Sequence, residues 1–379
     1  MSEQYPASAK VYSTENLGKW CILDMLAYFE EKGAMRVSDL HIKIGVPPVY
    51  RIDGDLVKLK GLTVTEEIAK QLIYPLLSDE NLSKLQTQYS VDCSYRYGSL
   101  QFRINVFKEN DGICAAIRAL SLKIPKIESI GFPNNIWEDI IDRKQGLVLV
   151  TGITGAGKST TIASLIDRIS EKHASRILTI EDPIEYIYQQ KHSIVSQREI
   201  GKDVSSFIDG LRAMLREDPD IIFVGEMRDP ETIAMTLMAA ETGHLVFSTL
   251  HTRDATGSIT RILDYFPPGR QNEVQNQLSL GLAYVLSQKL IPKKDGKGRL
   301  VAMEILNNKN YACANLIRTG KIEQLYSQMQ TKTKSGPDEK MITMEKHLAM
   351  LVKEDKVDLL EAQKWVNNII SFTDVMKRG

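Results

Sequence analysis

The chain has 379 residues, which is enough for two domains and a C-terminal tail. With 43% hydrophobic and 25% charged residues it resembles an ordinary globular protein, and its 48 Lys and Arg balance its 48 Asp and Glu. A net charge of zero argues against a general binder of nucleic acid. No apolar run reaches the roughly 18 residues of a membrane-spanning helix, and the polar N-terminus lacks the apolar core of a signal peptide. We therefore expect a cytoplasmic protein without direct membrane insertion.

Residues 1–120 are expected to form an α+β domain. Their apolar pattern changes from helical spacing to alternation and back. Helices are predicted at 17–32, 65–77 and 78–88, and strands at 39–44, 50–55 and across 92–119. Runs of strands beside runs of helices indicate a sheet with flanking helices.

We interpret residues 121–143 as an interdomain linker. Pro125, Gly131 and Pro133 interrupt this stretch, and such residues mark loops rather than regular elements. A short helix at 136–142 is predicted to lead into the next domain.

Residues 144–330 are expected to form a parallel α/β domain, because predicted strands and helices alternate. Strands are predicted at 147–151, 176–181, 221–225 and 245–250, with an edge strand at 301–306. Helices are predicted at 160–169, 203–215 and 229–243, and the chain beyond Thr256 is expected to be mostly helical to about Ile291. A polar loop at 331–340 and two amphipathic helices, 341–353 and 358–370, are predicted to form a helical tail over residues 331–379.

A phosphate-binding P-loop pattern, G-x-x-x-x-G-K-[ST], follows the first strand of this domain. It is formed by Gly152-Ile153-Thr154-Gly155-Ala156-Gly157-Lys158-Ser159-Thr160. Backbone N–H groups and the helix dipole favour phosphate at such a turn. Lys158 is expected to reach the β- and γ-phosphates of ATP, and Ser159 to hold Mg²⁺. A glycine-rich turn that binds nothing is the alternative, which the flanking strand and helix patterns disfavour.

Two acidic strand ends are candidates for activating the attacking water. In parallel α/β sheets such groups sit at the carboxyl ends of neighbouring strands. The segment 221–226 resembles a Walker B strand, but Gly225 stands at the usual metal-side aspartate, which leaves Glu226 to orient or deprotonate water. Glu181 ends another strand and is a candidate for an outer-shell oxygen near Mg²⁺. The alternative is that these carboxylates cap the next helix or pair with Arg228.

Three further basic side chains are candidates for phosphate recognition. His251 ends the strand 245–250 in a Thr-His pair and is a candidate γ-phosphate sensor, although a lone histidine is normally structural. Arg103 and Arg118 lie within otherwise apolar strands of the first domain. If the γ-phosphate of another domain lies opposite, they are arginine fingers; otherwise they are charges that protect an edge.

Together these motifs resemble the secretion ATPase superfamily, and within it the type IV pilus retraction ATPases, the PilT and PilU family. The likeness spans about residues 35–335. It rests on the P-loop at 152–160, an aspartate box at 179–186, the Walker B stretch at 218–229 and a histidine box at 241–252. The family also has glycine before its catalytic glutamate, which fits Gly225 and Glu226.

The resemblance implies a RecA-like motor domain, an N-terminal PAS-like domain and a homohexameric ring with nucleotide between the domains. Arg103 and Arg118 would then complete the site, and His251 becomes a stronger candidate. ATP and Mg²⁺ are the implied ligands. An inner-membrane pilus platform protein and a paralogous pilus ATPase are the implied partners, which would place the chain at the cytoplasmic face of the inner membrane.

Two features bear on which branch of the superfamily the chain resembles. Similar pilus-extension and type II secretion ATPases usually carry a four-cysteine zinc element, whereas the four cysteines here are isolated from one another. The stretch 312–321 resembles the retraction signature A-I-R-N-L-I-R-E-G-K, but it departs at Cys313, Ala314 and Thr319. We expect an ATPase motor for pilus retraction and twitching motility. The alternatives are an extension or secretion-assembly ATPase, and a divergent accessory subunit that regulates a partner motor.

Overall fold

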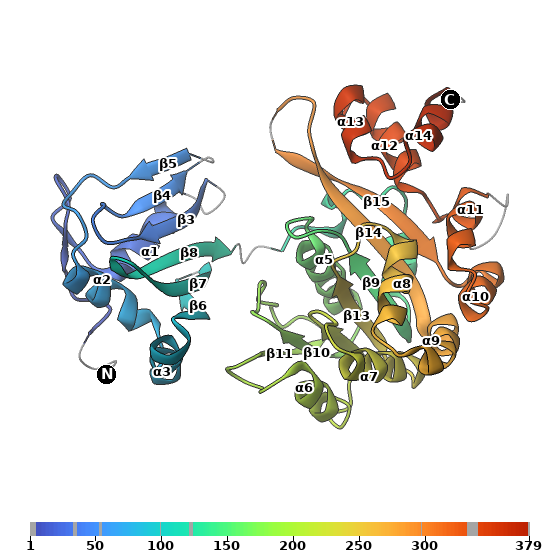
Figure 1. Ribbon diagram of the computed structural model, residues 1–379, viewed down its shortest axis with the longest axis horizontal. Helices are drawn as coiled ribbons and strands as arrows, with labels where there is room; N and C mark the ends of the chain where they lie inside the picture. Colours follow the sequence, from blue (N-terminus) through green and yellow to red (C-terminus); the bar gives the residue numbers. More distant parts are fainter. Residues whose placement is uncertain are drawn as a thin grey trace. The chain divides into compact units, whose positions relative to one another are not determined.

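The computed structural model describes residues 5–32, 36–52, 55–98, 100–120, 124–296, 298–331 and 340–377. The chain divides into two compact units (Figure 1), Met1–Lys123 with Pro183–Ile187, and Ile124–Asp182 with Tyr188–Gly379. The first three residues of the predicted linker and most of the predicted loop at 331–340 lie outside the described residues. Within the described ranges, no helix is long and apolar enough to cross a membrane.

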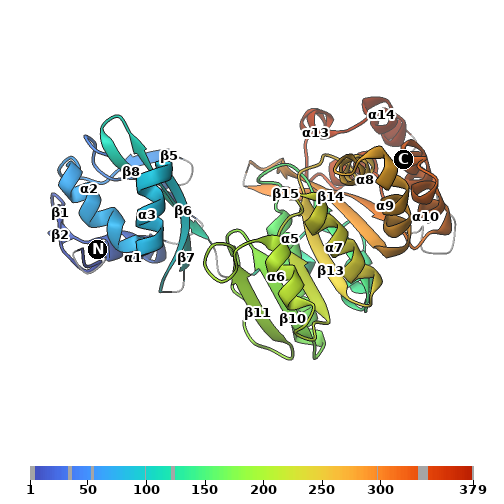
Figure 2. The same ribbon diagram turned by 60° about the horizontal axis from the view of Figure 1, so that its bottom comes forward.

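The first unit contains an antiparallel sheet with the strand order β5-β4-β3-β8-β7-β6. The strands are β3 (Val37–Ile42), β4 (Val49–Ile52), β5 (Asp55–Lys58), β6 (Ser90–Tyr97), β7 (Leu100–Glu109) and β8 (Gly112–Leu120). Helices α1 (Ile22–Lys32), α2 (Glu66–Ile73) and α3 (Asp79–Gln88) pack with one face of this sheet in a single apolar core (Figure 2). Phe102 and Ile104 of β7 point into that core, so Arg103 between them lies on the opposite face.

Most predicted elements of this unit are confirmed, with two differences. Helix α1 begins at Ile22 rather than at residue 17, because Gly18 turns the chain with a φ of 73° between the short strands β1 (Tyr12–Ser13) and β2 (Lys19–Trp20). Strand β5 was not predicted. All four of its residues are exposed, so no alternation of apolar and polar residues marks it.

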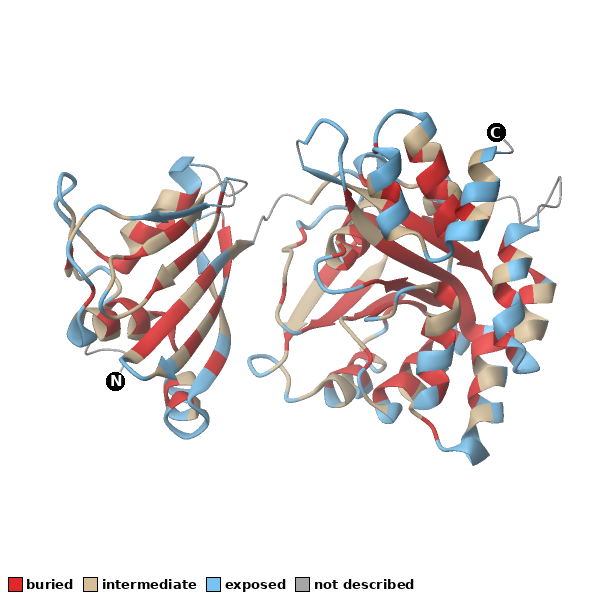
Figure 3. Ribbon diagram, turned by 45° about the horizontal axis from the view of Figure 1, so that its top comes forward, coloured by how far each residue is buried: buried red, intermediate tan, exposed pale blue. Residues whose placement is uncertain are grey.

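The second unit is built on a seven-stranded sheet with the order β11-β10-β12-β13-β9-β14-β15. All neighbours are parallel except β15, which runs antiparallel to β14 at the edge. The strands are β9 (Gly146–Thr151), β10 (Arg176–Glu181), β11 (Ile194–Glu199), β12 (Ile221–Val224), β13 (Leu245–Leu250), β14 (Leu282–Pro292) and β15 (Arg299–Asn307). The central strands are buried on both faces, as red ribbons show in Figure 3.

Helices connect these strands and cover the sheet. They are α4 (Ile136–Ile141), α5 (Lys158–Lys172), α6 (Phe207–Met214), α7 (Pro230–Glu241), α8 (Ala255–Asp264), α9 (Pro268–Gly281), α10 (Tyr311–Arg318) and α11 (Leu325–Gln330). Helix α7 begins where the sequence predicts a capped helix. Asp229 caps it by accepting from the N–H of Thr232, and Pro230 lies in its first turn. The α/β class predicted for this region is therefore confirmed.

The expectation of helix to about Ile291 is wrong. The chain is helical only to Gly281, and residues 282–292 form β14, which lies between β9 and β15 inside the sheet. Seven successive residues at the start of β14 are buried, so the strand shows no alternation that would separate it from a buried helix. Strand β11 was also not predicted, although it extends the parallel sheet at its far edge.

Three helices end the described part of the chain, where two were predicted. Helix α12 (Met344–Lys353) matches the first prediction, but the second region splits into α13 (Leu359–Trp365) and α14 (Ile369–Lys377). The break falls at Val366, whose backbone is extended. These helices share an apolar cluster with Ile291 of β14 and Ala302 of β15, so the tail packs on the β14–β15 hairpin.

Candidate nucleotide site

The P-loop lies between the end of β9 and the first turn of α5. Gly152, Gly155 and Gly157 all have positive φ values, of 149°, 77° and 86°. A Cβ on Gly152 would stand 2.5 Å from the backbone oxygen of Gln288, so no side chain fits there. The first N–H groups of α5 have no partner within the helix. A turn of this shape exposes backbone N–H groups to an anion.

Lys158 is the first residue of α5, and it is buried against the loop. Its Nζ donates to the backbone oxygens of Gly152 at 2.9 Å and Ile153 at 3.2 Å. Ser159 and Thr160 follow it in the same turn and are half-buried. The ammonium is therefore already held at the mouth of the loop, where a phosphate would approach.

Two side chains of strand β14 form hydrogen bonds with the P-loop and with the residues on either side of it. The side chain of Gln288 is buried, and its Nε2 donates to the backbone oxygen of Ala156 at 2.6 Å. Its Oε1 accepts from the hydroxyl of Thr161 at 2.9 Å. The Ser287 hydroxyl lies 2.7 Å from that of Thr151. Sequence reasoning missed both β14 residues, because it predicted a helix there.

His251, at the end of β13, links the P-loop to Glu226. Its Nδ1 lies 3.5 Å from the hydroxyl of Thr154 in the P-loop, and its Nε2 lies 3.7 Å from Oε2 of Glu226. Burial and the charge of Lys158 lower the pKa of His251. The imidazole is thus neutral at pH 7, so it can both donate and accept a hydrogen bond.

Glu226 lies two residues beyond the end of β12 and has a side chain only 13% exposed. Its Oε1 is paired with the guanidinium of Arg228. Both residues line a cavity of about 330 Å³ together with His251, Arg261 and Tyr265. Glu226 therefore forms the ion pair with Arg228 that was the alternative prediction, and it also lies close to His251.

Gly225 lies between β12 and Glu226 and packs closely against the end of β10. The Gly225 N–H donates to the backbone oxygen of Ile180 at 2.8 Å, and a Cβ on Gly225 would stand 3.1 Å from that oxygen. Thr249 of β13 donates to the Gly225 oxygen at 2.6 Å. A side chain at residue 225 would therefore need the neighbouring backbone to shift by a few tenths of an ångström.

Glu181 lies at the same edge of the sheet but farther from the P-loop. It ends β10, and β12 and β13 lie between that strand and β9. Three strand spacings amount to about 14 Å. Its Oε1 accepts from the Thr179 hydroxyl at 2.7 Å and from Gln197 at 3.1 Å.

Arg103 and Arg118 belong to the first unit, whereas the P-loop, Glu226 and His251 belong to the second. The two arginines are direct cross-strand partners on β7 and β8, so they share the face opposite the helices. Arg118 Nε lies 2.8 Å from Oδ1 of Asp39. Burial alone would raise the pKa of Asp39, but hydrogen bonds from Ser38 and Arg118 lower it overall. The two arginine side chains are 47% and 66% exposed on this sheet face.

A P-loop at a parallel strand end, with a glutamate and a histidine at the next two strand ends, defines a P-loop ATPase. Comparison with known proteins agrees with this class. The profile described as Type II/IV secretion system protein matches residues 31–364, and the chain belongs to that family.

Individual relatives cover most of the chain. It is 43% identical over 311 residues to the type IV pilus retraction ATPase PilT of Pseudomonas aeruginosa, covering 82% of this chain and 89% of that protein. It is 33% identical over 358 residues to the type IV pilus ATPase PilU of the same organism, covering 94% and 91%. A crystal structure of the pilus retraction motor PilT with bound ADP superposes with a TM-score of 0.83 at 43% identity, covering 94% of this chain and 100% of that one.

Proposed function

We propose that this chain hydrolyses ATP to power the retraction of type IV pili, and so drives twitching motility. The observation that carries the proposal is the contact chain from Thr154 in the P-loop through His251 to Glu226. It joins a phosphate-binding turn to a carboxylate that can act on water. The 43% identity to a retraction ATPase over most of both chains supports the mechanical role.

In this proposal the P-loop residues Gly152, Ile153, Thr154, Gly155, Ala156, Gly157, Lys158, Ser159 and Thr160 bind the phosphates. The residues fit the ligand, since Gly152, Gly155 and Gly157 all adopt positive φ and form a turn that exposes backbone N–H groups to an anion. Ser159 would hold Mg²⁺, which would neutralise charge on the β- and γ-phosphate oxygens. Lys158 would exchange its loop carbonyls for those oxygens.

Glu226 would orient and deprotonate the attacking water. The water oxygen bonds to the γ-phosphorus while the bond to the β–γ bridging oxygen breaks, and ADP leaves with that oxygen. Neutral His251, between Thr154 and Glu226, would report the γ-phosphate to the carboxylate. The Arg228 pair holds Glu226 until water and phosphate are in place.

The remaining assignments rest on the resemblance to the retraction family. Arg103 and Arg118 would stabilise the γ-phosphate charge across domains of a homohexamer, and Glu181 would orient water near Mg²⁺. We propose an inner-membrane platform protein and a paralogous pilus ATPase as partners, and a position at the cytoplasmic face of that membrane. We also propose that residues 1–120 form the N-terminal domain and residues 121–143 the interdomain linker. Residues 144–330 would form the motor domain, and residues 331–379 the helical tail.

An accessory ring subunit is the second candidate. The relative named PilU covers 94% of this chain, against 82% for PilT. Deletion of the gene in a piliated host separates the two. Loss of retraction with pili retained supports the main motor, whereas normal retraction that weakens only under load supports the accessory role. Loss of pili altogether would contradict both and point to extension.

A further inference from the structure

A buried glutamate of strand β15 contacts the first residue of helix α8. Oε1 of Glu304 accepts from the backbone N–H of Ala255 at 2.8 Å, and Glu304 is only 1% exposed. The first N–H groups of a helix have no partner within the helix, so this carboxyl satisfies one of them. Glu304 therefore anchors the first turn of α8 to the sheet.

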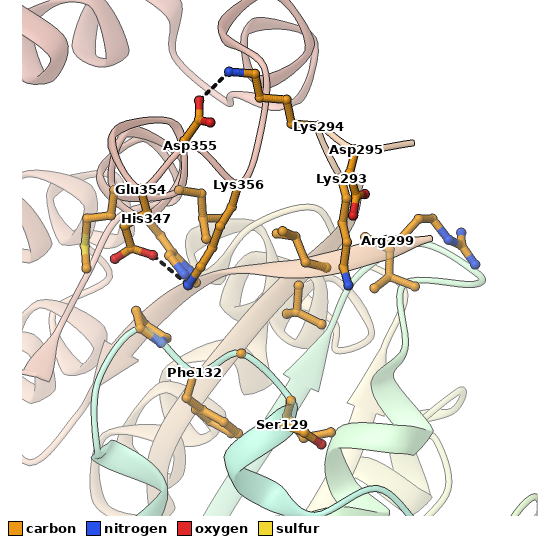
Figure 4. Close-up of a pocket in the computed structure, with 18 of the residues that line it drawn as sticks. Ser129, Phe132, Lys293, Lys294, Asp295, Arg299, His347, Glu354, Asp355 and Lys356 are labelled. Atoms are coloured by element: carbon orange, nitrogen blue, oxygen red, sulfur yellow. Dashed lines mark hydrogen bonds and ion pairs between the residues drawn. The ribbon is translucent and has the colours of Figure 1, made fainter. Parts of the chain in front are cut away.

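The C-terminal tail binds β15 on both sides of Glu304. Helix α12 shares an apolar cluster with the β14–β15 hairpin, and Figure 4 shows His347 on this helix. Nδ1 of His347 accepts from the N–H of Met303 at 2.9 Å. Ile305 exchanges two backbone hydrogen bonds with Ile342, at 2.8 and 3.2 Å. The residues before and after Glu304 are thus fixed, and the carboxyl has a rigid base.

The segment between β13 and α8 carries His251 and depends on the start of α8. Ala255 lies four residues after His251. Within the segment, the Thr252 hydroxyl lies 2.6 Å from that of Ser258, and Ser258 donates to the Asp254 oxygen at 2.7 Å. These bonds tie the segment to the first turn of the helix. A shift of that turn would therefore carry the histidine with it.

His251 makes two contacts that a small shift would break. Its Nδ1 lies 3.5 Å from the Thr154 hydroxyl, and its Nε2 lies 3.7 Å from Oε2 of Glu226. A well-formed hydrogen bond spans roughly 2.7–3.2 Å, and catalytic hydrogen bonds are often longer until substrate binds. The imidazole must therefore stay in place for both contacts to tighten when ATP arrives.

The contact between Glu304 and α8 does not depend on the charge of the carboxyl. Burial raises the pKa of Glu304 to about 7, and the charges of Asp254 and Glu345 add to this effect. A protonated carboxyl keeps an acceptor oxygen, so Ala255 has its partner in both forms. Oε2 of Glu304 has no hydrogen-bond partner among the described residues. A glutamine can therefore replace Glu304 and keep the contact.

We propose that Glu304 is a positioning residue for ATP hydrolysis, which keeps His251 in reach of the P-loop and Glu226 by anchoring the first turn of α8. The inference rests on the proposed function, because the histidine acts there between the γ-phosphate and the catalytic carboxylate. Glu304 acts only through the segment 251–255. The C-terminal tail belongs to the same support, since it binds β15 on both sides of this carboxyl.

The first test asks whether Glu304 acts through His251. ATP hydrolysis is measured for Glu304→Leu, His251→Ala and the double variant. Glu304→Leu removes the acceptor for the Ala255 N–H, so kcat should fall about 2- to 12-fold, the effect of one hydrogen bond, while KM for ATP stays close to the wild-type value. In the His251→Ala background the same change should cause no further loss. An unchanged kcat, or an equal fold-loss in both backgrounds, overturns the inference.

Two further variants separate positioning from a general loss of stability. Glu304→Gln keeps an acceptor for Ala255 and should retain most of the wild-type kcat. Asn308→Leu also removes a buried polar side chain just beyond β15, where Asn308 Nδ2 donates to the Ser279 and Leu282 oxygens at 3.1 and 3.0 Å. It should lower stability in urea without lowering kcat. A loss of kcat in either variant as large as in Glu304→Leu contradicts the positioning role.

Hydrogen exchange checks the structural step directly. Amides of residues 251–258 should exchange faster in Glu304→Leu than in wild type, whereas those of β9 should not change; unchanged exchange at 251–258 overturns the inference. If Glu304→Leu does not fold, Glu304→Asp takes its place, because the shorter side chain does not reach Ala255. These failures leave the proposed function intact as long as the wild-type chain hydrolyses ATP. A wild-type chain without ATP hydrolysis would instead refute the proposed function, and the inference with it.

Discussion

Gln288→Leu should loosen the P-loop and weaken nucleotide binding, although residue 288 touches no nucleotide in our account. The substitution removes the amide that bridges the Ala156 oxygen and the Thr161 hydroxyl, at 2.6 and 2.9 Å. Both groups would be left in a buried place without a partner. Each such loss costs about 1–3 kcal/mol, so the folded loop should lose roughly 2–6 kcal/mol relative to its relaxed forms.

Part of this loss should appear as a raised KM for ATP, because an unsupported loop must be ordered by the phosphates. Steady-state hydrolysis and urea unfolding are measured on the same preparations. Gln288→Glu is a useful companion, since it keeps an acceptor for Thr161 but sets an oxygen against the Ala156 oxygen. It should bind ATP at least as poorly.

The control is Gln190→Leu, an exposed residue in the loop that precedes β11. That side chain also bridges backbone groups, donating to the Val195 oxygen at 2.9 Å and accepting from the Val195 N–H at 3.1 Å. It lies beside the far edge of the sheet, so its loss should leave KM unchanged. A Gln288→Leu chain with wild-type KM, or a Gln190→Leu chain with an equal rise, would refute the reasoning.

Two further predictions concern charge. Glu304 is fully buried, its Oε2 has no partner in the described part of the chain, and burial raises its pKa to about 7. The folded state therefore keeps a proton that the unfolded chain has lost, so stability should fall as pH rises from about 4.5 to 7, by at most about 1.4 kcal/mol per unit. Glu304→Gln should remove most of that fall in urea unfolding; an unchanged pH profile would contradict it. Mixing Arg103→Ala with Lys158→Ala subunits should restore part of the ATPase activity if Arg103 acts on a neighbour's nucleotide, and no recovery would argue against action across subunits.

The sequence alone predicted the parts of the site that are local in the chain. The P-loop and the acid after β12 are short motifs whose spacing carries their chemistry, and both lie at parallel strand ends as expected. The hydrogen bonds from β14 to the P-loop could not be predicted from the sequence, for two reasons. Gln288 meets Ala156 across 132 residues, and the strand that brings it there is buried throughout its first seven residues. Without alternation, periodicity does not distinguish such a strand from a helix.

Contacts between segments far apart in the chain also determine structural features that no sequence motif describes. A Cβ on Gly225 would stand 3.1 Å from the Ile180 oxygen, a contact between segments that are 45 residues apart in the chain. Similarly, the last predicted helix is split at Val366, where Lys289 donates to the oxygen of Trp365 at the end of α13 and Glu345 accepts from the N–H of Asn367. Such partners become visible only once the sheet is assembled.

The most direct test of the account is ATP turnover by Glu226→Gln. Glutamine preserves the size of the side chain but does not accept a proton from water. The account predicts that the purified variant binds ATP as tightly as wild type, while hydrolysis falls by about 10²- to 10⁴-fold, the usual contribution of a general base. Wild-type turnover in Glu226→Gln would contradict the central claim that this carboxylate activates the water.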